Sequence, residues 1–270
     1  ERMLFDITLF SYYSKIQRKP KGHLYLYPLI AIAAMLAIVF VMDLPHMHKP
    51  KQQLSQTIRI PAGQRAQMDL PDGSIVWLNS QTTLTYDENF GKKDRKVTLD
   101  GEAYFEVAHN KEIPFYVQTE NIKVQVTGTK FDVCSYKGSN SFIARLIEGS
   151  INLLTNNAKE EKPITSLTKG KYFSMENGKY KTGEMSSNNA LAWMQGIYYF
   201  DDVPFKELLD KIALYYNYKI TVKNPKILEN YRCTGKFKDL DGIEHILKVI
   251  QKDHPFKYNI DNEHNKITIE

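Results

Sequence analysis

The longest apolar stretch of the chain lies near its start. Residues 24–42 include no charged residue, and only Pro28 among them falls outside the hydrophobic class. A helix of this length covers about 28 Å, and the hydrocarbon core of a bilayer is about 30 Å thick. Pro28 lies in the first turns, where a missing amide costs least, and Tyr25 and Tyr27 suit a membrane interface. The pattern predicts a transmembrane helix over residues 24–43.

Two other interpretations of this stretch fit less well. A cleaved signal peptide has an apolar region of about 7 to 15 residues that ends in small residues, whereas this stretch ends at Asp43 without a small pair. A core helix that is apolar on every side needs a large domain around it. The flanking basic residues are Lys15, Arg18, Lys19 and Lys21 before the stretch and Lys49 and Lys51 after it. This bias predicts a cytoplasmic N-terminus over residues 1–23 and a tether on the far side of the membrane over residues 44–56.

Short alternations of apolar and polar residues dominate from residue 57 to residue 182. Apolar residues at every second position are typical of half-buried strands. Turn residues such as Asp100-Gly101, Glu148-Gly149 and Asn177-Gly178 separate the runs. We therefore expect a mainly β protein, with an all-β domain of the sandwich, roll or solenoid class over residues 57–182. The alternating positions are Ala66/Met68/Leu70, Val97/Leu99, Ala103/Phe105/Val107, Ile122/Val124/Val126, Phe131/Val133, Phe142/Ala144/Leu146 and Ile151/Leu153.

The periodicity changes to that of helices after a polar stretch over residues 183–192, which is expected to be a linker. Two helix faces follow, each continued by strand-like sequence, so residues 193–270 are predicted to form a small α+β domain of two strand-helix-strand halves. The first helix face consists of Phe205, Leu208, Leu209, Ile212, Ala213 and Tyr216, and the second consists of Ile243, Ile246, Leu247 and Ile250.

Composition and charge exclude some classes of protein. With 42% hydrophobic and 25% charged residues, the chain is neither wholly disordered nor a protein with many membrane spans. The net charge of +5 includes the basic residues beside the predicted span. The other basic residues are scattered through strand-like sequence without a basic helix, so direct binding of nucleic acid is not expected.

Candidate residues for chemistry are few. No phosphate-binding loop, zinc spacing or nucleophile elbow occurs, and no cofactor or metal is expected. Glu102 and Glu106 lie four residues apart on one strand face, where a carboxylate pair can act on glycans, but the solvated face of a half-buried strand is the simpler interpretation. His46 and His48 form an H-x-H pair that fits a polar tether better than a metal site. Spacing alone leaves open whether Cys134 and Cys233 form a disulfide.

The sequence around Gly128 and Thr129 interrupts a pair of predicted strands. A threonine hydroxyl behind a strained glycine peptide can attack the glycine carbonyl in an N-to-O acyl shift. The alternative is a glycine bulge or bend with a hydroxyl nearby. Gly128 and Thr129 are therefore candidate self-cleavage residues, and the chain is otherwise not expected to be an enzyme.

Five segments of the all-β region form an ordered set of motifs. They are Ile60-Pro61-Ala62-Gly63-Gln64-Arg65, Leu70-Pro71-Asp72-Gly73-Ser74-Ile75-Val76-Trp77-Leu78-Asn79, Gly101-Glu102-Ala103-Tyr104-Phe105-Glu106-Val107, Pro114-Phe115-Tyr116-Val117 and Gly128-Thr129-Lys130-Phe131-Asp132-Val133. In this order the segments resemble those of the FecR family of transmembrane anti-sigma factors. The region from Trp193 to Ile269 resembles the small domain that ends these proteins, which is related to the N-terminal fold of secretins and TonB-dependent transporters.

The resemblance implies a single-pass protein of the bacterial inner membrane. A TonB-dependent outer-membrane transporter would present its periplasmic signalling domain to the C-terminal region, and the protein would regulate an extracytoplasmic-function sigma factor in the cytoplasm. In some members the Gly-Thr pair is a self-cleavage site, and Gly128 and Thr129 occupy that motif. Family members carry a longer cytoplasmic helical segment than residues 1–23, so we expect this end to be truncated. The alternative is a membrane-anchored periplasmic carbohydrate-binding or hydrolytic β-protein that uses Glu102 and Glu106.

Overall fold

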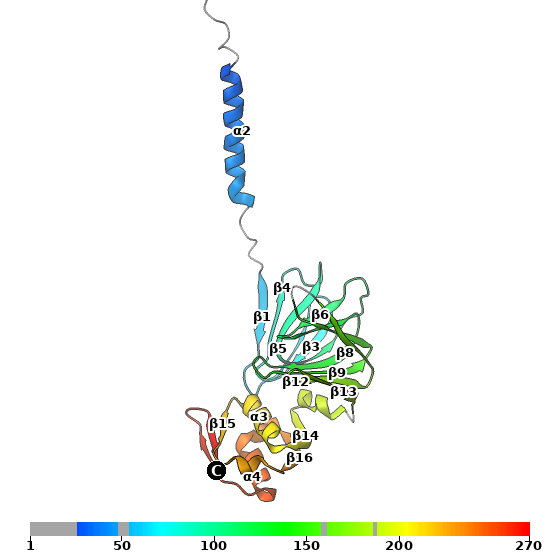
Figure 1. The fold of residues 1–270 in the computed structure, drawn as a ribbon, viewed down its shortest axis with the longest axis vertical. Coiled ribbons are helices and arrows are strands. Elements are labelled where there is room, and N and C mark those ends of the chain that lie inside the picture. The colour runs from blue at the N-terminus through cyan, green and yellow to red at the C-terminus, as the bar shows by residue number, and fades with distance from the viewer. Residues whose placement is uncertain (1–25, 48–53, 158–160, 186–187) are drawn as a thin grey trace, which may run out of the picture. The chain divides into compact units, whose positions relative to one another are not determined.

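A computed structural model describes residues 26–47, 54–157, 161–185 and 188–270 (Figure 1). It separates into two units, residues 1–52 and 53–270. In the first unit, α2 (Leu26–Met47) is a helix whose described side chains, at residues 27–40, are all exposed. A search of the described residues finds no helix that combines the length and apolar character needed to cross a bilayer. The predicted span over residues 24–43 falls partly outside the described residues and stays a prediction.

The β region of the second unit is one continuous sheet of 13 strands that follows the predicted alternation closely (Figure 1). It is a single curled sheet and not the two separate sheets of a sandwich. The strands are β1 (Ser55–Arg59), β2 (Ala66–Asp69), β3 (Ile75–Leu78), β4 (Thr83–Asp87), β5 (Arg95–Glu106), β6 (Phe115–Gln118), β7 (Ile122–Val126), β8 (Lys130–Ser135), β9 (Ser141–Glu148), β10 (Ser150–Thr155), β11 (Pro163–Thr168), β12 (Lys171–Glu176) and β13 (Lys179–Glu184).

Strand β5 is the longest strand and joins the two halves of the sheet. Its first half pairs with β4 and β6, and its second half pairs with β3 and β8. The predicted turn at Asp100-Gly101 is therefore wrong, because the strand continues through it. Gly101 has φ +137°, and a Cβ there would lie 2.4 Å from Thr82 Oγ1. Glycine lets the strand bend and pass close to Thr82, so here it marks a change of partner strands and not a chain reversal.

The other two predicted turns are confirmed. Gly149 separates β9 from β10, and Asn177-Gly178 joins β12 to β13 with positive φ at both residues. Positive φ at both central positions is the geometry of the two-residue hairpin loop that suits twisted strands.

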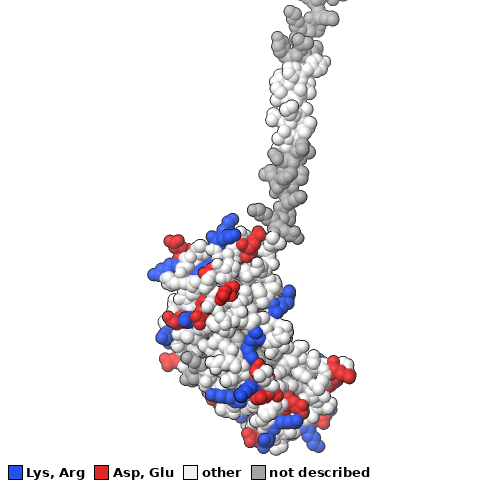
Figure 2. Space-filling model, turned by 180° about the vertical axis from the view of Figure 1, so that it is seen from behind, with Lys and Arg blue, Asp and Glu red and all other residues white. Residues whose placement is uncertain are grey.

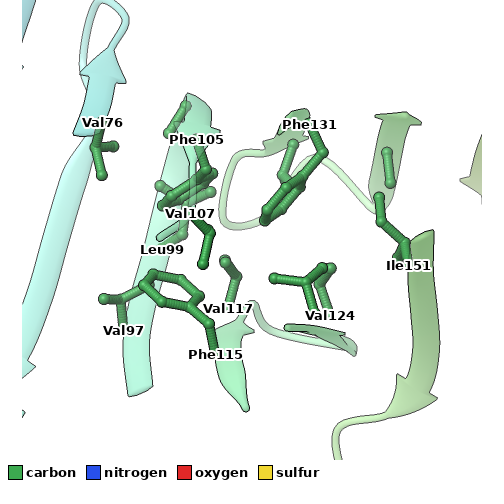
Figure 3. Packing of buried hydrophobic residues seen from close by; sticks show 14 of the residues in the cluster. Val76, Val97, Leu99, Phe105, Val107, Phe115, Val117, Val124, Phe131 and Ile151 are labelled. Atoms are coloured by element: carbon green, nitrogen blue, oxygen red, sulfur yellow. The ribbon is translucent and has the colours of Figure 1, made fainter. Parts of the chain in front are cut away.

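The core of the β region consists of buried side chains that lie between its strands (Figure 3). Phe105 and Phe131 stack at 5.1 Å between ring centroids, and Phe115 meets Phe105 edge-on at 5.9 Å. All three rings are fully buried, and branched residues such as Val97 and Val124 fill the space between them. Phe105, Phe131, Val97 and Val124 belong to predicted alternating runs, so period 2 identified this face of their strands correctly. Phe115 lies outside the predicted runs.

The α+β region confirms the two predicted halves. Its elements are η1 (Asn188–Gln195), β14 (Ile197–Pro204), α3 (Phe205–Tyr216), β15 (Lys219–Val222), η2 (Pro225–Leu228), β16 (Arg232–Lys238), η3 (Asp239–Asp241), α4 (Gly242–Asp253), β17 (Tyr258–Asp261) and β18 (Lys266–Ile269). Strand β14 pairs with β16, and β15 pairs in parallel with β18, which also pairs with β17.

The two helices bury most of the predicted faces. Helix α4 buries the four predicted residues Ile243, Ile246, Leu247 and Ile250. Helix α3 buries Phe205, Leu208, Leu209, Ile212 and Tyr215, whereas the predicted Ala213 and Tyr216 are half-buried.

Residues expected to form a linker carry ordered structure. Strand β13 extends to Glu184, and η1 occupies Asn188–Gln195. Trp193 of η1 is only 4% exposed and joins the core of the α+β region together with Tyr104 of β5. The two regions therefore share buried side chains.

Candidate functional site

The predicted self-cleavage pair, Gly128 and Thr129, lies in the connection from β7 to β8. The pair lies beside the turn between β9 and β10. Thr129 is 4% exposed, and its Oγ1 donates a hydrogen bond to the carbonyl of Ser150 at 2.9 Å. The hydroxyl is thus buried and held by the main chain.

Gly128 is required by close packing and not by an unusual φ. Its φ lies outside the left-handed region, so the expectation of a strained glycine conformation is not supported. A Cβ at this position would lie 2.4 Å from Nδ1 and 2.9 Å from Cα of His109. Since contacts this short do not occur, any larger residue must displace the chain around His109.

Gly149 provides the second close contact of this pair. Its φ is +93°, and a Cβ there would lie 2.9 Å from Thr129 Oγ1 and 3.0 Å from the carbonyl oxygen of Gly128. The attacking hydroxyl and the carbonyl that an N-to-O acyl shift requires therefore both border Gly149. The absence of a side chain leaves room beside them.

The two glutamates of the alternative hypothesis have different surroundings. Glu102 is 4% exposed and accepts a hydrogen bond from Asn79 Nδ2 at 2.6 Å, so the expected solvated strand face is wrong for this residue. Glu106 is partly exposed and lies 3.4 Å from Lys130 Nζ. The α+β region covers this face of β5 near Glu102, which strand periodicity could not indicate.

Glu102 belongs to a buried group of charges that we call the carboxylate cluster: Glu102, Asp132 and Arg145. Arg145 Nη1 lies 2.5 Å from Asp132 Oδ2 and 3.8 Å from Glu102 Oε1. Asp132 is fully buried, and the Arg145 side chain is 19% exposed. One guanidinium thus faces two carboxyl groups in a place of low solvent access, where an uncompensated charge is costly.

Burial changes the protonation of the cluster. Desolvation raises the pKa of Glu102 from 4.5 to about 7, with a further rise caused by Asp132, while Arg145 and the Asn79 hydrogen bond oppose it. Desolvation also raises the pKa of Asp132, and Arg145 opposes that rise. Glu102 therefore carries its proton well above the pH at which an exposed glutamate loses it.

A second set of contacts joins the two regions directly, and we call it the junction. It consists of Gly63, Ser80 and Gln81 of the β region with Leu214 and Tyr215 at the end of α3. The carbonyl of Tyr215 accepts hydrogen bonds from Gly63 N at 3.0 Å and Ser80 Oγ at 2.8 Å, and Gln81 donates to the carbonyl of Leu214. The last carbonyls of a helix have no partner within the helix. The β region thus caps α3.

A cavity of about 230 Å³ opens between the carboxylate cluster and the α+β region. Its walls include Glu102, Arg145 and Trp193. Trp193 lies close enough to lower the pKa of Asp132, yet Trp193 Nε1 and Asp132 Oδ1 have no hydrogen bond of normal geometry.

Of the remaining predicted candidates, Cys134 lies opposite Glu102 on the neighbouring strand and lines the cavity with it. Cys134 and Cys233 are both free, and burial raises the pKa of each thiol. His48 and the side chain of His46 lie outside the described residues. Acidic and basic side chains are interspersed over the described residues of the face in Figure 2.

Sequence reasoning missed His109, Asp132 and Arg145 as site residues. Asp132 and Arg145 occupy positions between buried residues of β8 and β9, so alternation assigns them to solvent. The signal available in the sequence was weak: Asp132 lies three residues after Thr129 in a segment that already suggested a family. His109 shows its importance only through contact with Gly128.

Comparison with known proteins agrees with this architecture. The family model described as FecR protein matches residues 56–152, and the model described as FecR, C-terminal matches residues 197–269. Together they cover more than half of the chain. The chain belongs to the FecR family. The FecR match lies within the β region, and the C-terminal match covers β14 to β18.

Two crystal structures share this fold. Both are of a candidate anti-sigma factor from Parabacteroides distasonis ATCC 8503, at 2.50 Å and 1.65 Å resolution. Each is 24% identical to this chain and covers 80% of it and 98% of its own length, with TM-scores of 0.67 and 0.68. No curated protein matches the chain significantly.

Proposed function

We propose that this FecR-family chain is a single-pass anti-sigma factor and signal transducer of the inner membrane. Residues 1–23 are cytoplasmic, residues 24–43 cross the membrane and the second unit lies in the periplasm. The C-terminal region receives a signal from a TonB-dependent outer-membrane transporter, and the protein regulates an extracytoplasmic-function sigma factor. The family match and the fold shared with candidate anti-sigma factors support this proposal.

The observation that carries the proposal is the junction. The carbonyls that end α3 are bonded by Gly63, Ser80 and Gln81 of the β region. A partner that shifts α3 must therefore strain or break bonds to the β region, which lies nearer in sequence to the membrane segment. This is the connection that a receiver needs in order to pass a signal onward.

Strand addition is the recognition mode that we favour. Among the described residues, β15 and β17 are the edges of a three-stranded sheet, and each pairs only with β18. An edge strand offers unpaired main-chain groups to a partner strand, while its side chains provide specificity. The β15 edge alternates exposed and half-buried residues, Lys219 to Val222, over its four positions.

Hydrogen exchange tests the recognition mode. The protein is mixed with the periplasmic signalling domain of the transporter encoded beside its gene. Binding should slow exchange of amides in β15 or β17 and leave β13, an edge of the β region, unchanged. Absence of binding, or protection confined to the β region, would remove the receptor assignment.

Reporter and topology measurements test the rest of the proposal. A transcription reporter that depends on the sigma factor encoded beside this gene should change its expression when the whole gene is deleted. When only residues 193–270 are removed, the reporter should no longer respond to the transporter substrate. A periplasmic reporter enzyme fused after residue 56 should be active, and one fused at the N-terminus should be inactive. The opposite pattern of fusions would reverse the orientation.

We also propose, as a second function, self-cleavage between Gly128 and Thr129. The specific observation is that Thr129 Oγ1 and the Gly128 carbonyl oxygen both border Gly149. Thr129→Ala removes the nucleophile and should leave only the full-length band, whereas Thr129→Ser keeps a hydroxyl and should still give two fragments. A wild-type protein that stays full-length would contradict self-cleavage and leave the transducer proposal standing.

The hydrolytic alternative has its own test. Replacement of Glu102 and Glu106 together by glutamine should leave the sigma-dependent response intact under the transducer proposal. Loss of glycan binding or hydrolysis in that variant, with an intact response, would establish a separate activity.

A further inference from the structure

The segment that follows β5 runs alongside the Gly128-Thr129 pair. The amide of Val107 donates to the carbonyl of Thr129 at 3.0 Å, and the amide of Asn110 donates to the carbonyl of Thr127 at 2.7 Å. The acceptors of these two bonds lie on either side of Gly128 in one segment. Their donors lie on either side of His109 in the facing segment. The main chain therefore fixes His109 opposite Gly128.

A buried arginine also holds the segment that follows β5. Arg95 is 2% exposed, and its guanidinium donates to the carbonyls of Ala108 at 2.7 Å and Asn110 at 3.0 Å. The amide of Ala108 also donates to Ser74 Oγ at 3.0 Å. Both neighbours of His109 are thus anchored, while His109 itself is exposed. This arrangement provides a fixed backbone with a solvent-accessible imidazole.

The imidazole lies close to the peptide bond between Gly128 and Thr129. The position of a Cβ on Gly128 is 2.4 Å from His109 Nδ1. A Cβ lies about 2.5 Å from the carbonyl carbon of its own residue, given ordinary bond lengths and angles. Nδ1 is therefore within about 5 Å of the Gly128 carbonyl carbon, a distance that one water molecule or a small ring rotation can bridge.

We propose that His109 is the proton-transfer residue of this site. The inference rests on the self-cleavage proposed above. His109 accepts the proton of Thr129 Oγ, and Oγ attacks the Gly128 carbonyl carbon. The carbon–nitrogen bond then breaks as His109 delivers the proton to the amide nitrogen of Thr129. Water hydrolyses the resulting ester, which leaves a carboxylate on Gly128 and a free amine and hydroxyl on Thr129.

The local structure explains why such a group is needed. Thr129 Oγ1 donates its hydrogen to the Ser150 carbonyl, which cannot take the proton away. Gly128 also lacks the left-handed φ that would indicate a strained backbone. A base and acid beside the peptide is a source of acceleration that needs neither feature, and general acid–base catalysis typically contributes about 10²- to 10⁴-fold.

The decisive experiment measures the rate of fragment formation in four forms of the full-length chain: wild type, His109→Ala, Thr129→Ala and His245→Ala. His245 is an exposed histidine on α4 and serves as the matched control. Wild type and His245→Ala should give a fragment whose first residue is Thr129. His109→Ala should be at least about 100-fold slower, and added imidazole should restore part of the rate.

The fluorescence of Trp77 and Trp193 shows whether each variant is folded. Partial rescue by imidazole is the readout that a merely structural role would not give. Cleavage of His109→Ala at the wild-type rate would overturn the role of His109. The role would also be overturned if His109→Ala is folded and has lost cleavage, and added imidazole does not restore it. If the wild type does not cleave, both this role and self-cleavage fail, and the transducer proposal is tested separately by the reporter.

Discussion

Two polar sites of this FecR-family protein, one just before strand β8 and one within it, hold their polar groups in opposite ways. Just before the strand, Thr129 and Gly128 are neutral and are held by main-chain bonds and close packing against His109 and Gly149. Within the strand, Asp132 is an ionisable residue that is fully buried and held by the side chain of Arg145. The first site depends on shape and the second on charge, so they should fail under different perturbations.

The largest effect should come from removal of the only arginine in the carboxylate cluster. Arg145→Met leaves Asp132 and Glu102 buried without a counter-charge, and loss of one partner of a buried pair costs about 3–5 kcal/mol of unfolding free energy. Urea unfolding followed by tryptophan fluorescence measures it. Arg59→Met, on an exposed position of edge strand β1, is the control and should change little. Equal stabilities of the two variants would show that the cluster charge is solvated.

The next effect is a pH dependence that only the charged site should have. The folded pKa of Glu102, about 7, lies above the ordinary value of 4.5, so the folded state binds the extra proton. This contribution to stability is complete below pH 4.5 and is lost as the pH rises to 7. The pKa difference corresponds to roughly 3 kcal/mol.

Glu102→Gln should remove this part of the pH dependence and make the protein more stable than wild type above pH 7. Urea titrations between pH 4.5 and pH 8 measure the difference. Asp132 keeps its own raised pKa, so a smaller slope should remain. Glu176→Gln, on an exposed position, should preserve the wild-type slope. An unchanged slope in Glu102→Gln would mean that burial does not govern this carboxyl.

The shape-dependent site should respond to one methyl group. Gly128→Ala places a Cβ against His109 and should cost about 1–3 kcal/mol, the usual range for overpacking. His109→Ala combined with Gly128→Ala removes the contact with Nδ1 but not the one with Cα, so it should restore only part of the loss. Full tolerance of Gly128→Ala, measured by thermal unfolding, would show that the 107–110 segment moves freely.

The smallest effect should appear at the junction. Ser80→Ala removes one hydrogen bond to the carbonyl of Tyr215, while the amide of Gly63 still donates to it. The expected loss is about 1 kcal/mol, with faster proteolysis between the two regions. Ser166→Ala, on the exposed face of β11, is the matched control. If the two variants behave alike, the junction adds little to the packing of the α+β region.

Most secondary structure was predictable because it depends on local periodicity. The four buried residues of α4 and the alternating core positions of β5 and of β7 to β10 follow from spacing alone. The turn at Asp100-Gly101 was not predictable in the same way, because the same glycine can end a strand or bend it. Only the partners of β5 on each side of Gly101 decide between these outcomes.

The family motifs, the two folded regions and the Gly128-Thr129 pair can all be found from local patterns in the sequence. Which polar residues are buried depends on how the two regions pack. Asp132 and Arg145 alternate with core residues and look solvent-facing along their strands, but the α+β region packs over them. Likewise His109 and Gly128 are distant in sequence, and main-chain bonds to Thr127 and Thr129 bring them together. Burial and long-range contact depend on what covers a surface, and a local pattern cannot encode that.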